Sequence, residues 1–202
     1  MTKGTLFIIS APSGAGKTSL VAEILKRVAN IKASVSHTTR ACRPGEQDGV
    51  NYYFVSLALF QKMVKHADFL EHAEVFGNYY GTSEQWVRDT LACGTDVILE
   101  IDWQGAEQTR QQFPSSKSIF ILPPSLQALE ARLNNRGQDN SSVINQRVAA
   151  AKDEMSHYAE ADYLMVNDDF QLALSHLEKI ILGQIDQNSV MVDEDLINNL
   201  LA

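Results

Sequence analysis

The sequence predicts an α/β fold in which a mostly parallel central sheet is covered by helices on both faces. Three observations support this prediction. Short, almost wholly apolar runs occur at 5–10, 95–101, 118–122 and 162–166, helical patterns separate them, and Gly or Pro marks several of their borders. Apolar runs of this length are typical of strands that are buried on both faces, as in parallel sheets.

The helices are predicted from apolar residues at helical spacing. The first helix follows a glycine-rich turn, with Leu20, Val21 and Ile24 on one face. A second begins after Thr82 or Ser83, where Gln85 is placed to close a capping box. The helical patterns beyond the first lie at 83–93, 104–112, 125–135, 141–158 and 170–184.

Two regions break this alternation and indicate insertions. Residues 33–82 hold short polar and aromatic strand-like pieces around one helix near 56–66. Residues 126–150 are rich in Arg, Asn and Gln. Both lie on the side of the sheet where open α/β folds bind ligands. The predicted core is 1–32, 83–125 and 151–185, followed by a weakly helical tail at 186–202.

Composition limits the class of protein. The chain has 202 residues, 45% of them hydrophobic, which suits one globular unit, and its charge of −8 argues against a polynucleotide partner. No apolar run approaches the roughly 18 residues of a membrane span, and the N-terminus does not fit a signal peptide. Cys42 and Cys93 lack metal-ligand spacing, so we expect free thiols, no membrane association and a cytoplasmic location.

The strongest motif follows the first predicted strand and precedes the first helix. It matches the phosphate-binding P-loop except that Ala11 replaces the first glycine. Gly14 and Gly16 let backbone N–H groups approach phosphates, Lys17 reaches the β and γ phosphates, and the Thr18 hydroxyl binds Mg²⁺. The predicted ATP-binding residues here are Ala11, Pro12, Ser13, Gly14, Ala15, Gly16, Lys17 and Thr18. The alternative is a simple glycine-rich connector. The motif alone predicts a P-loop NTPase-type three-layer fold in an NTPase or a kinase.

Further blocks give the sequence a resemblance to a known family. They include 34–54, 69–83, Glu100 to Gly105, Ile121 to Ser125 and Val166 to Asp169. In order and approximate spacing, and together with the P-loop, these blocks resemble the guanylate kinase family from about residue 4 to 184. The resemblance implies that 33–82 is a GMP-binding insertion and that 126–150 is a lid.

The resemblance implies an acceptor site for guanosine monophosphate. Arg40 and Arg43 would clamp the monophosphate, Glu71 would read the guanine N1–H and N2–H₂, and Glu100 replaces the family's usual aspartate. The matching residues are Ser36, Arg40, Arg43, Tyr52, Glu71, Tyr80, Thr82 and Glu100. The alternatives are that Glu71 is a solvated surface charge, that the tyrosines are core aromatics and that the arginines are surface ion-pair partners.

The resemblance also implies residues for ATP and for catalysis. Arg132, Arg136 and Arg147 would cover the ATP phosphates, Arg136 and Asn167 would touch the adenosine, and Asp102 would hold Mg²⁺ through water. Asp102 is otherwise a turn aspartate at a strand end. The implied catalytic residues are Lys17, Arg40, Arg132, Arg136 and Arg147.

The implied activity is Mg²⁺-assisted in-line phosphoryl transfer from ATP to GMP, with dGMP also accepted, in purine metabolism and GMP recycling. No general base is expected, because the GMP phosphate is already a competent nucleophile. A homo-oligomer is left open. Two alternatives remain. One is a non-catalytic guanylate-kinase-like scaffold domain that binds peptides, and the other is a P-loop kinase for AMP, a pyrimidine nucleotide or a sugar.

Overall fold

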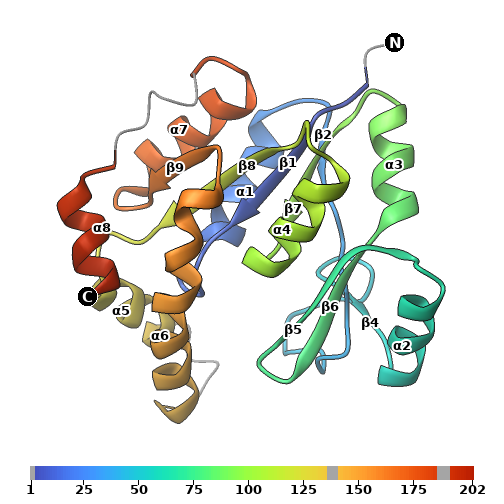
Figure 1. Cartoon of the computed structure of the whole chain (residues 1–202), viewed down its shortest axis with the longest axis horizontal. Coiled ribbons are helices and arrows are strands. Elements are labelled where there is room, and N and C mark those ends of the chain that lie inside the picture. Colours follow the sequence, from blue (N-terminus) through green and yellow to red (C-terminus); the bar gives the residue numbers. More distant parts are fainter. Residues whose placement is uncertain (1–2, 136–140, 186–191) are drawn as a thin grey trace. The chain divides into compact units, whose positions relative to one another are not determined.

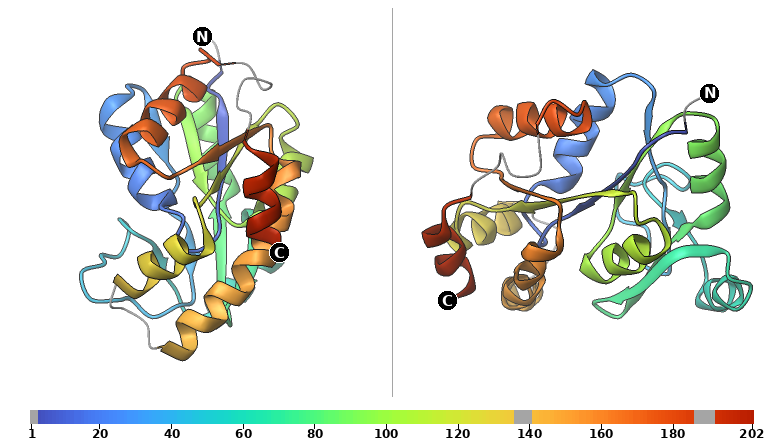
Figure 2. Two further views of the ribbon diagram at one scale, coloured as in Figure 1. Left: turned by 90° about the vertical axis from the view of Figure 1, so that its left-hand side faces the viewer. Right: turned by 45° about the horizontal axis from the view of Figure 1, so that its top comes forward.

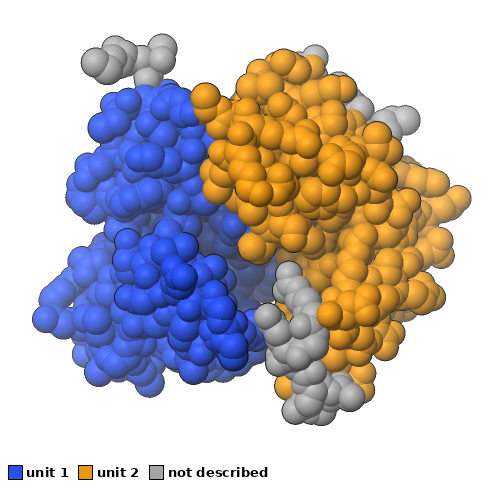
Figure 3. Space-filling view, turned by 180° about the vertical axis from the view of Figure 1, so that it is seen from behind, with its two compact units in different colours: residues 1–6, 30–116 blue, residues 7–29, 117–202 orange. Residues whose placement is uncertain are grey.

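The computed structural model describes residues 3–135, 141–185 and 192–202. The chain divides into two compact units, which Figure 3 distinguishes by colour. Unit 1 comprises residues 1–6 and 30–116, and unit 2 comprises residues 7–29 and 117–202. Among the described residues, no helix is long and apolar enough to cross a membrane.

A five-stranded parallel sheet provides the α/β architecture that the sequence predicts. Its strand order is β2-β7-β1-β8-β9. The strands are β1 (Leu6–Ser10), β2 (Ile31–Ala33), β7 (Asp96–Glu100), β8 (Lys117–Leu122) and β9 (Tyr163–Val166). All five residues of β1 are buried, as expected for a strand covered on both faces.

A second, four-stranded sheet lies wholly in unit 1, within the predicted insertion and its immediate border. Its order is β4-β3-β6-β5. The strands are β3 (His37–Thr38), β4 (Tyr53–Phe54), β5 (Phe69–Val75) and β6 (Asn78–Ser83). β5 and β6 form an antiparallel hairpin, and β3 pairs antiparallel with β6. Gly77 at the hairpin turn has φ +73, a conformation that glycine adopts without strain.

The helices of unit 1 pack against these strands. They are α2 (Leu57–Lys65), α3 (Glu84–Ala92) and α4 (Trp103–Gln112). Ser56 caps α2 by accepting from Leu59 N, and Asp102 caps α4 by accepting from Gly105 N. The ring of Phe60 on α2 contacts the Phe69 ring, with centroids 4.7 Å apart.

The helices of unit 2 cover both faces of its strands. In Figure 2, α1 and α7 lie side by side on one face of β1, β8 and β9, while α6 and α8 lie on the other. The helices are α1 (Lys17–Arg27), α5 (Leu126–Asn135), α6 (Ser141–Ser156), α7 (Phe170–Ile181) and α8 (Glu194–Leu201), with a short 3₁₀ helix at His157–Glu160. A core cluster joins Phe120, Leu129, Met155 and Leu200.

Two local differences from the sequence predictions have physical reasons. The short strand β2 was not predicted, because only Ile31 of its three residues is buried. The capping-box prediction is wrong: Ser83 is the N-cap and accepts from Trp86 N, so Gln85 lies one position too early and binds Asp89 instead.

The described part of the tail forms α8, in agreement with its weak helical pattern, and Leu200 is buried in the unit 2 core.

Candidate functional site

The glycine-rich loop of unit 2 has the backbone that phosphate binding requires. Gly14 and Gly16 have φ +97 and +95, in the left-handed region that favours glycine. Helix α1 begins at Lys17, directly after the loop, and its N-cap Gly16 has no side chain to accept from the first-turn N–H groups. These N–H groups and the positive end of the helix form a suitable environment for an anion.

The end of β9 supports this loop from within unit 2. The side-chain amide of Asn167 donates to Ala15 O at 2.7 Å, and Arg132 Nη2 donates to Asn167 O at 2.8 Å. A Cβ on Gly16 would collide with the Asn167 amide nitrogen. Asn167 and Arg132 are both predicted to contact ATP. Asn167 therefore contacts the backbone of the loop, and Arg132 contacts the backbone of Asn167.

Two side chains of α6 also contact the loop. Arg147 donates to the Ser13 hydroxyl, and Ser13 N donates to the Glu154 carboxylate at 3.1 Å. The two residues are seven positions apart, so they lie on the same face of α6. Arg147 was predicted to lie near the phosphates, whereas no sequence signal indicated Glu154. Arg136, the third predicted lid arginine, lies outside the described residues.

One face of the second sheet gathers the residues predicted to recognise the acceptor base. In this sheet Thr38 pairs with Tyr80, and Glu71 pairs with Thr82. Directly paired residues share a face, and so do residues two apart in a strand. The Ser36 and Thr82 hydroxyls lie 3.2 Å apart and hydrogen bond to each other.

A β-bulge in β5 brings Glu71 to this face. Phe69 pairs with Ser83 and Glu71 pairs with Thr82, so β5 contains one extra residue between these two pairs. Phe69 consequently packs on the opposite face, where its ring contacts Phe60 and His37. Glu71 is only 3% exposed, so the alternative that it is a solvated surface charge is wrong.

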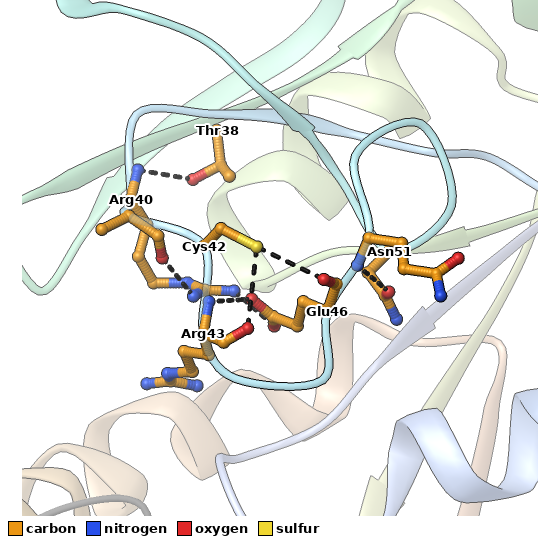
Figure 4. Close-up of polar contacts among 8 residues, drawn as sticks. Thr38, Arg40, Cys42, Arg43, Glu46 and Asn51 are labelled. Atoms are coloured by element: carbon orange, nitrogen blue, oxygen red, sulfur yellow. Dashed lines mark hydrogen bonds and ion pairs between the residues drawn. The ribbon is translucent and has the colours of Figure 1, made fainter.

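The loop after β3 holds Arg40 through a partly buried ion pair. Figure 4 shows contacts of both arginines of the loop converging on Glu46. Arg40 Nη2 donates to Glu46 Oε1 at 2.7 Å, and the backbone N of Arg43 donates to Glu46 Oε2 at 2.8 Å. The side chains of Arg40 and Glu46 are 12% and 20% exposed. Glu46, which sequence reasoning missed, therefore fixes the loop that carries both predicted phosphate-binding arginines.

The charge states of this group suit anion binding. Burial lowers the pKa of Arg40, but its hydrogen bond to Glu46, followed by the Glu46 charge and the Tyr80 phenol, raises it overall. The Arg40 hydrogen bond holds the pKa of the Glu46 carboxyl below its usual value. Arg40 therefore carries a full positive charge in this half-buried position.

Tyr52 remains a neutral hydrogen-bond donor. Burial raises the pKa of its phenol, and the neighbouring Tyr80 and Glu100 groups raise it further. Its ring packs against the ring of Tyr80, with centroids 5.9 Å apart, and lies 5.3 Å from the Arg40 guanidinium. Glu100, at the end of β7, thus lies close enough to this cluster for its charge to act on Tyr52.

Asp102 is the N-cap of α4, as the strand-end turn alternative predicted. Its Oδ1 accepts from Gly105 N at 2.9 Å and its Oδ2 from the Gln104 amide at 3.2 Å. Each carboxylate oxygen can accept a further hydrogen bond, so the capping role leaves capacity for a water. Within the described part of the chain, no group of three or more acidic, His or Cys side chains could hold a metal.

The residues that the sequence predicts to bind the two substrates thus belong to different units. The acceptor residues belong to unit 1, and the phosphate loop with Arg132, Arg147 and Asn167 belongs to unit 2. Glu46 was missed although it lies in the block 34–54, because its partners Arg40 and Arg43 are set by how that loop folds. Glu154 was missed because it lies outside the motifs and contacts Ser13 across 141 residues of sequence.

Comparisons with known proteins agree on one family. The family model for guanylate kinase matches residues 3–184. A guanylate kinase of Saccharophagus degradans is 63% identical over 180 residues, covering 89% of this chain and 88% of that protein. One of Alcanivorax borkumensis is 58% identical over 202 residues, covering 99% and 98%. The crystal structure of a guanylate kinase from Anaplasma phagocytophilum has a TM-score of 0.77 at 32% identity, covering 100% of this chain and 97% of that one.

Proposed function

Because this chain belongs to the guanylate kinase family, we propose that it transfers the terminal phosphoryl group of ATP to GMP, giving ADP and GDP. The observation that best supports this assignment is the buried Glu71 carboxylate on the same sheet face as the Ser36 and Thr82 hydroxyls. A buried acid beside paired hydroxyls matches a ligand edge that offers N–H donors, as guanine does.

Guanine recognition follows from the chemistry of this face. The Glu71 carboxylate accepts from the guanine N1–H and N2–H₂ groups, and Ser36 and Thr82 take the remaining base contacts. Adenine has an acceptor at N1 and would leave Glu71 opposite a lone pair. Sites built on buried hydrogen bonds discriminate by about 10⁴–10⁵-fold. Glu100 keeps the acidic charge near the Tyr52 end of the pocket.

The acceptor phosphate is held by two guanidinium groups and two phenols. Arg40 and Arg43 bind its oxygens, and the raised pKa of Tyr52 keeps that phenol protonated as a donor at neutral pH. Tyr80, which packs edge-on against Tyr52, donates in the same way. Several fixed donors orient the phosphate oxygen that attacks the γ-phosphorus of ATP.

ATP is bound by the loop from Ala11 to Thr18, with Lys17 at the β and γ phosphates. Arg132, Arg136 and Arg147 neutralise the charge that spreads over the transferring group, and Asn167 and Arg136 lie toward the adenosine. The contact between Arg147 and Ser13 supports this placement for Arg147. A bond forms from the GMP phosphate oxygen to the γ-phosphorus as the bond to the β–γ bridging oxygen breaks, so ADP leaves and no general base is needed.

Thr18 and Asp102 are the proposed protein ligands for Mg²⁺. Their oxygen atoms suit a hard cation that keeps most of its waters and binds chiefly to nucleotide phosphates. The spare acceptor capacity of the Asp102 carboxylate fits a contact through water. The ion, when bound with ATP, neutralises phosphate charge.

The remaining expectations form part of the proposal. Residues 33–82 serve as the GMP-binding insertion, 126–150 as the lid and 186–202 as a tail on the core. The second sheet, which occupies much of the first range, supports that division. The proposal includes use of dGMP, a cytoplasmic location, and no polynucleotide or membrane partner.

A coupled ADP-release assay with GMP, AMP, CMP, UMP and dGMP tests the function. We expect GMP to be favoured over AMP by about 10⁴-fold in kcat/KM, because AMP presents the lone pair of adenine N1 to the Glu71 carboxylate in place of an N–H donor. Equal rates with GMP and AMP would contradict the role of Glu71. Negligible ADP release with every acceptor would instead favour a non-catalytic, peptide-binding module.

A further inference from the structure

Strand β5 is at the edge of the second sheet, and a side chain of α4 pairs with its outer backbone. Gln108 Oε1 accepts from His72 N at 3.1 Å, and Gln108 Nε2 donates to His72 O at 3.0 Å. One side-chain amide thus makes the two hydrogen bonds that a paired residue of a further antiparallel strand would make.

A second glutamine of α4 holds the same strand two residues away. Gln112 Nε2 donates to Leu70 O at 2.7 Å. The residues held by the two glutamines, Leu70 and His72, are the immediate neighbours of Glu71. The backbone of Glu71 is therefore fixed on both sides by α4, at the position where the bulge alters the strand.

The same face of α4 sets the space available to the Glu71 carboxylate. Gly105 lies three positions before Gln108 and seven before Gln112, so the three residues share one helix face. A Cβ on Gly105 would lie 2.5 Å from Glu71 Oε2 and 3.2 Å from its carboxyl carbon. Any side chain at position 105 would have to displace the carboxylate.

We infer that α4 is a specificity element in which Gln108, Gln112 and Gly105 position Glu71 against the guanine base. They are positioning residues that act through Glu71, and the inference rests on the proposed role of Glu71 in guanine binding. Two hydrogen-bonded glutamines fix the strand, and a glycine leaves room for the acid. Together they place the carboxylate where it can accept from both guanine N–H groups.

The test compares GMP with IMP, whose base lacks only the 2-amino group, in the variant Gln108→Leu/Gln112→Leu. We expect kcat/KM for GMP to fall about tenfold, as for loss of one hydrogen bond to a charged group, with a much smaller change for IMP. The GMP/IMP ratio then falls about tenfold, while KM for ATP stays unchanged. General damage to the fold would lower kcat/KM for GMP and for IMP by the same factor and leave the GMP/IMP ratio unchanged. An unchanged ratio in the folded variant therefore overturns the inference.

Two further variants make the result specific. Gln111→Leu, at an exposed position of the same helix, should keep the wild-type ratio. In a Glu71→Ala background, the double glutamine change should no longer alter the ratio, because its target is gone. If Glu71→Ala itself keeps the wild-type ratio, the proposed role of Glu71 fails. If Glu71→Ala lowers the GMP/IMP ratio and the glutamine variant keeps the wild-type ratio, only the present inference fails.

Gly105→Ala provides an independent variant should the glutamine variant fail to fold. Its added methyl group pushes directly on the carboxylate, so the same loss of GMP/IMP discrimination is expected. A thermal melt establishes that the variant is folded. A folded Gly105→Ala enzyme with the wild-type ratio overturns the inference.

Discussion

At the scale of single residues, His37 shows how the second sheet combines a polar face with an apolar one. Its ring stacks on Tyr53 at 4.8 Å and contacts the edge of Phe69, on the face opposite Thr38. Its Nδ1 is buried without a hydrogen-bond partner in the described structure. Burial lowers the pKa of His37, against smaller opposing effects of the Gly81 backbone, Asp48 and Asp68.

This arrangement makes stability depend on pH. The unfolded chain binds a proton at His37 near pH 6.5, whereas the folded chain binds it only at lower pH. The stability contributed by the neutral ring is therefore fully present above about pH 6.5 and lost as the pH falls through the lowered folded pKa.

Urea unfolding at pH 7.5 and pH 5.0 measures the effect. As the pH is lowered from 7.5 to 5.0, we expect the free energy of unfolding to fall less for His37→Phe than for the wild type. The variant lacks only the His37 proton uptake, and all other titrating groups are common to both proteins. His176→Phe, a change of the same type at an exposed position of α7 in unit 2, provides the control for the substitution itself. An equal fall in wild type and His37→Phe would contradict the prediction.

At the scale of elements, the long apolar strands and the periodic helices were predictable. Burial on both faces makes a strand apolar throughout, and burial on one face gives a helix apolar residues at helical spacing. β1, β8 and β9 lie within one residue of the predicted ranges. The short strands β2, β3 and β4 carry too few residues for a pattern. The N-cap of α3 depended on a choice between Thr82 and Ser83, which the hydrogen bond from Trp86 N to the Ser83 hydroxyl decides in favour of Ser83.

Helix α8 illustrates a tertiary contact that its sequence pattern indicated only weakly. Leu200 is 1% exposed and packs in the cluster with Met155 of α6 and Leu122 of β8. The helix therefore completes the core of unit 2.

Leu200→Ala should destabilise the protein by about 2–5 kcal/mol, the usual cost of truncating a buried leucine. Leu201→Ala removes the same atoms at a neighbouring position that is 37% exposed, so its effect should be clearly smaller. Chemical denaturation of both variants checks this. Equal effects would show that Leu200 does not carry the packing of α8.

The candidate site was predictable where side chains belong to motifs and unpredictable where the fold brings them together. The P-loop residues and the acceptor set could be named from the sequence. The contact of Glu154 with the loop and the glutamine contacts to β5 depend on tertiary structure. The ion pair of Arg40 with Glu46 depends on how the loop between them folds. The bulge that turns Glu71 inward likewise leaves no compositional trace.

At the scale of the whole molecule, the residues proposed to carry the chemistry are divided between the two units. The proposed guanine and acceptor-phosphate residues lie in unit 1, and Lys17 with the glycine loop lies in unit 2. A change in one set of residues should therefore affect one substrate more than the other.

Lys17→Ala should lower kcat by at least about 10²–10³-fold, because the ammonium group stabilises charge on the transferring phosphoryl group. Calorimetric titration should show GMP binding within about twofold of the wild type, since no proposed GMP ligand is altered. Lys26→Ala, on the exposed side of the same helix, should retain full turnover. Substantial turnover by Lys17→Ala would remove this residue from the mechanism.

The extra residue in β5 links the length of the strand to the helix beside it. Residues two apart in a regular strand share a face, so without the bulge Glu71 would lie beside Phe69 on the aromatic side. Deleting Leu70 instead would leave Phe69 and Glu71 on opposite faces of a regular strand, but it would remove the carbonyl group that Gln112 of α4 holds. The additional residue therefore gives α4 a backbone group through which it holds this strand.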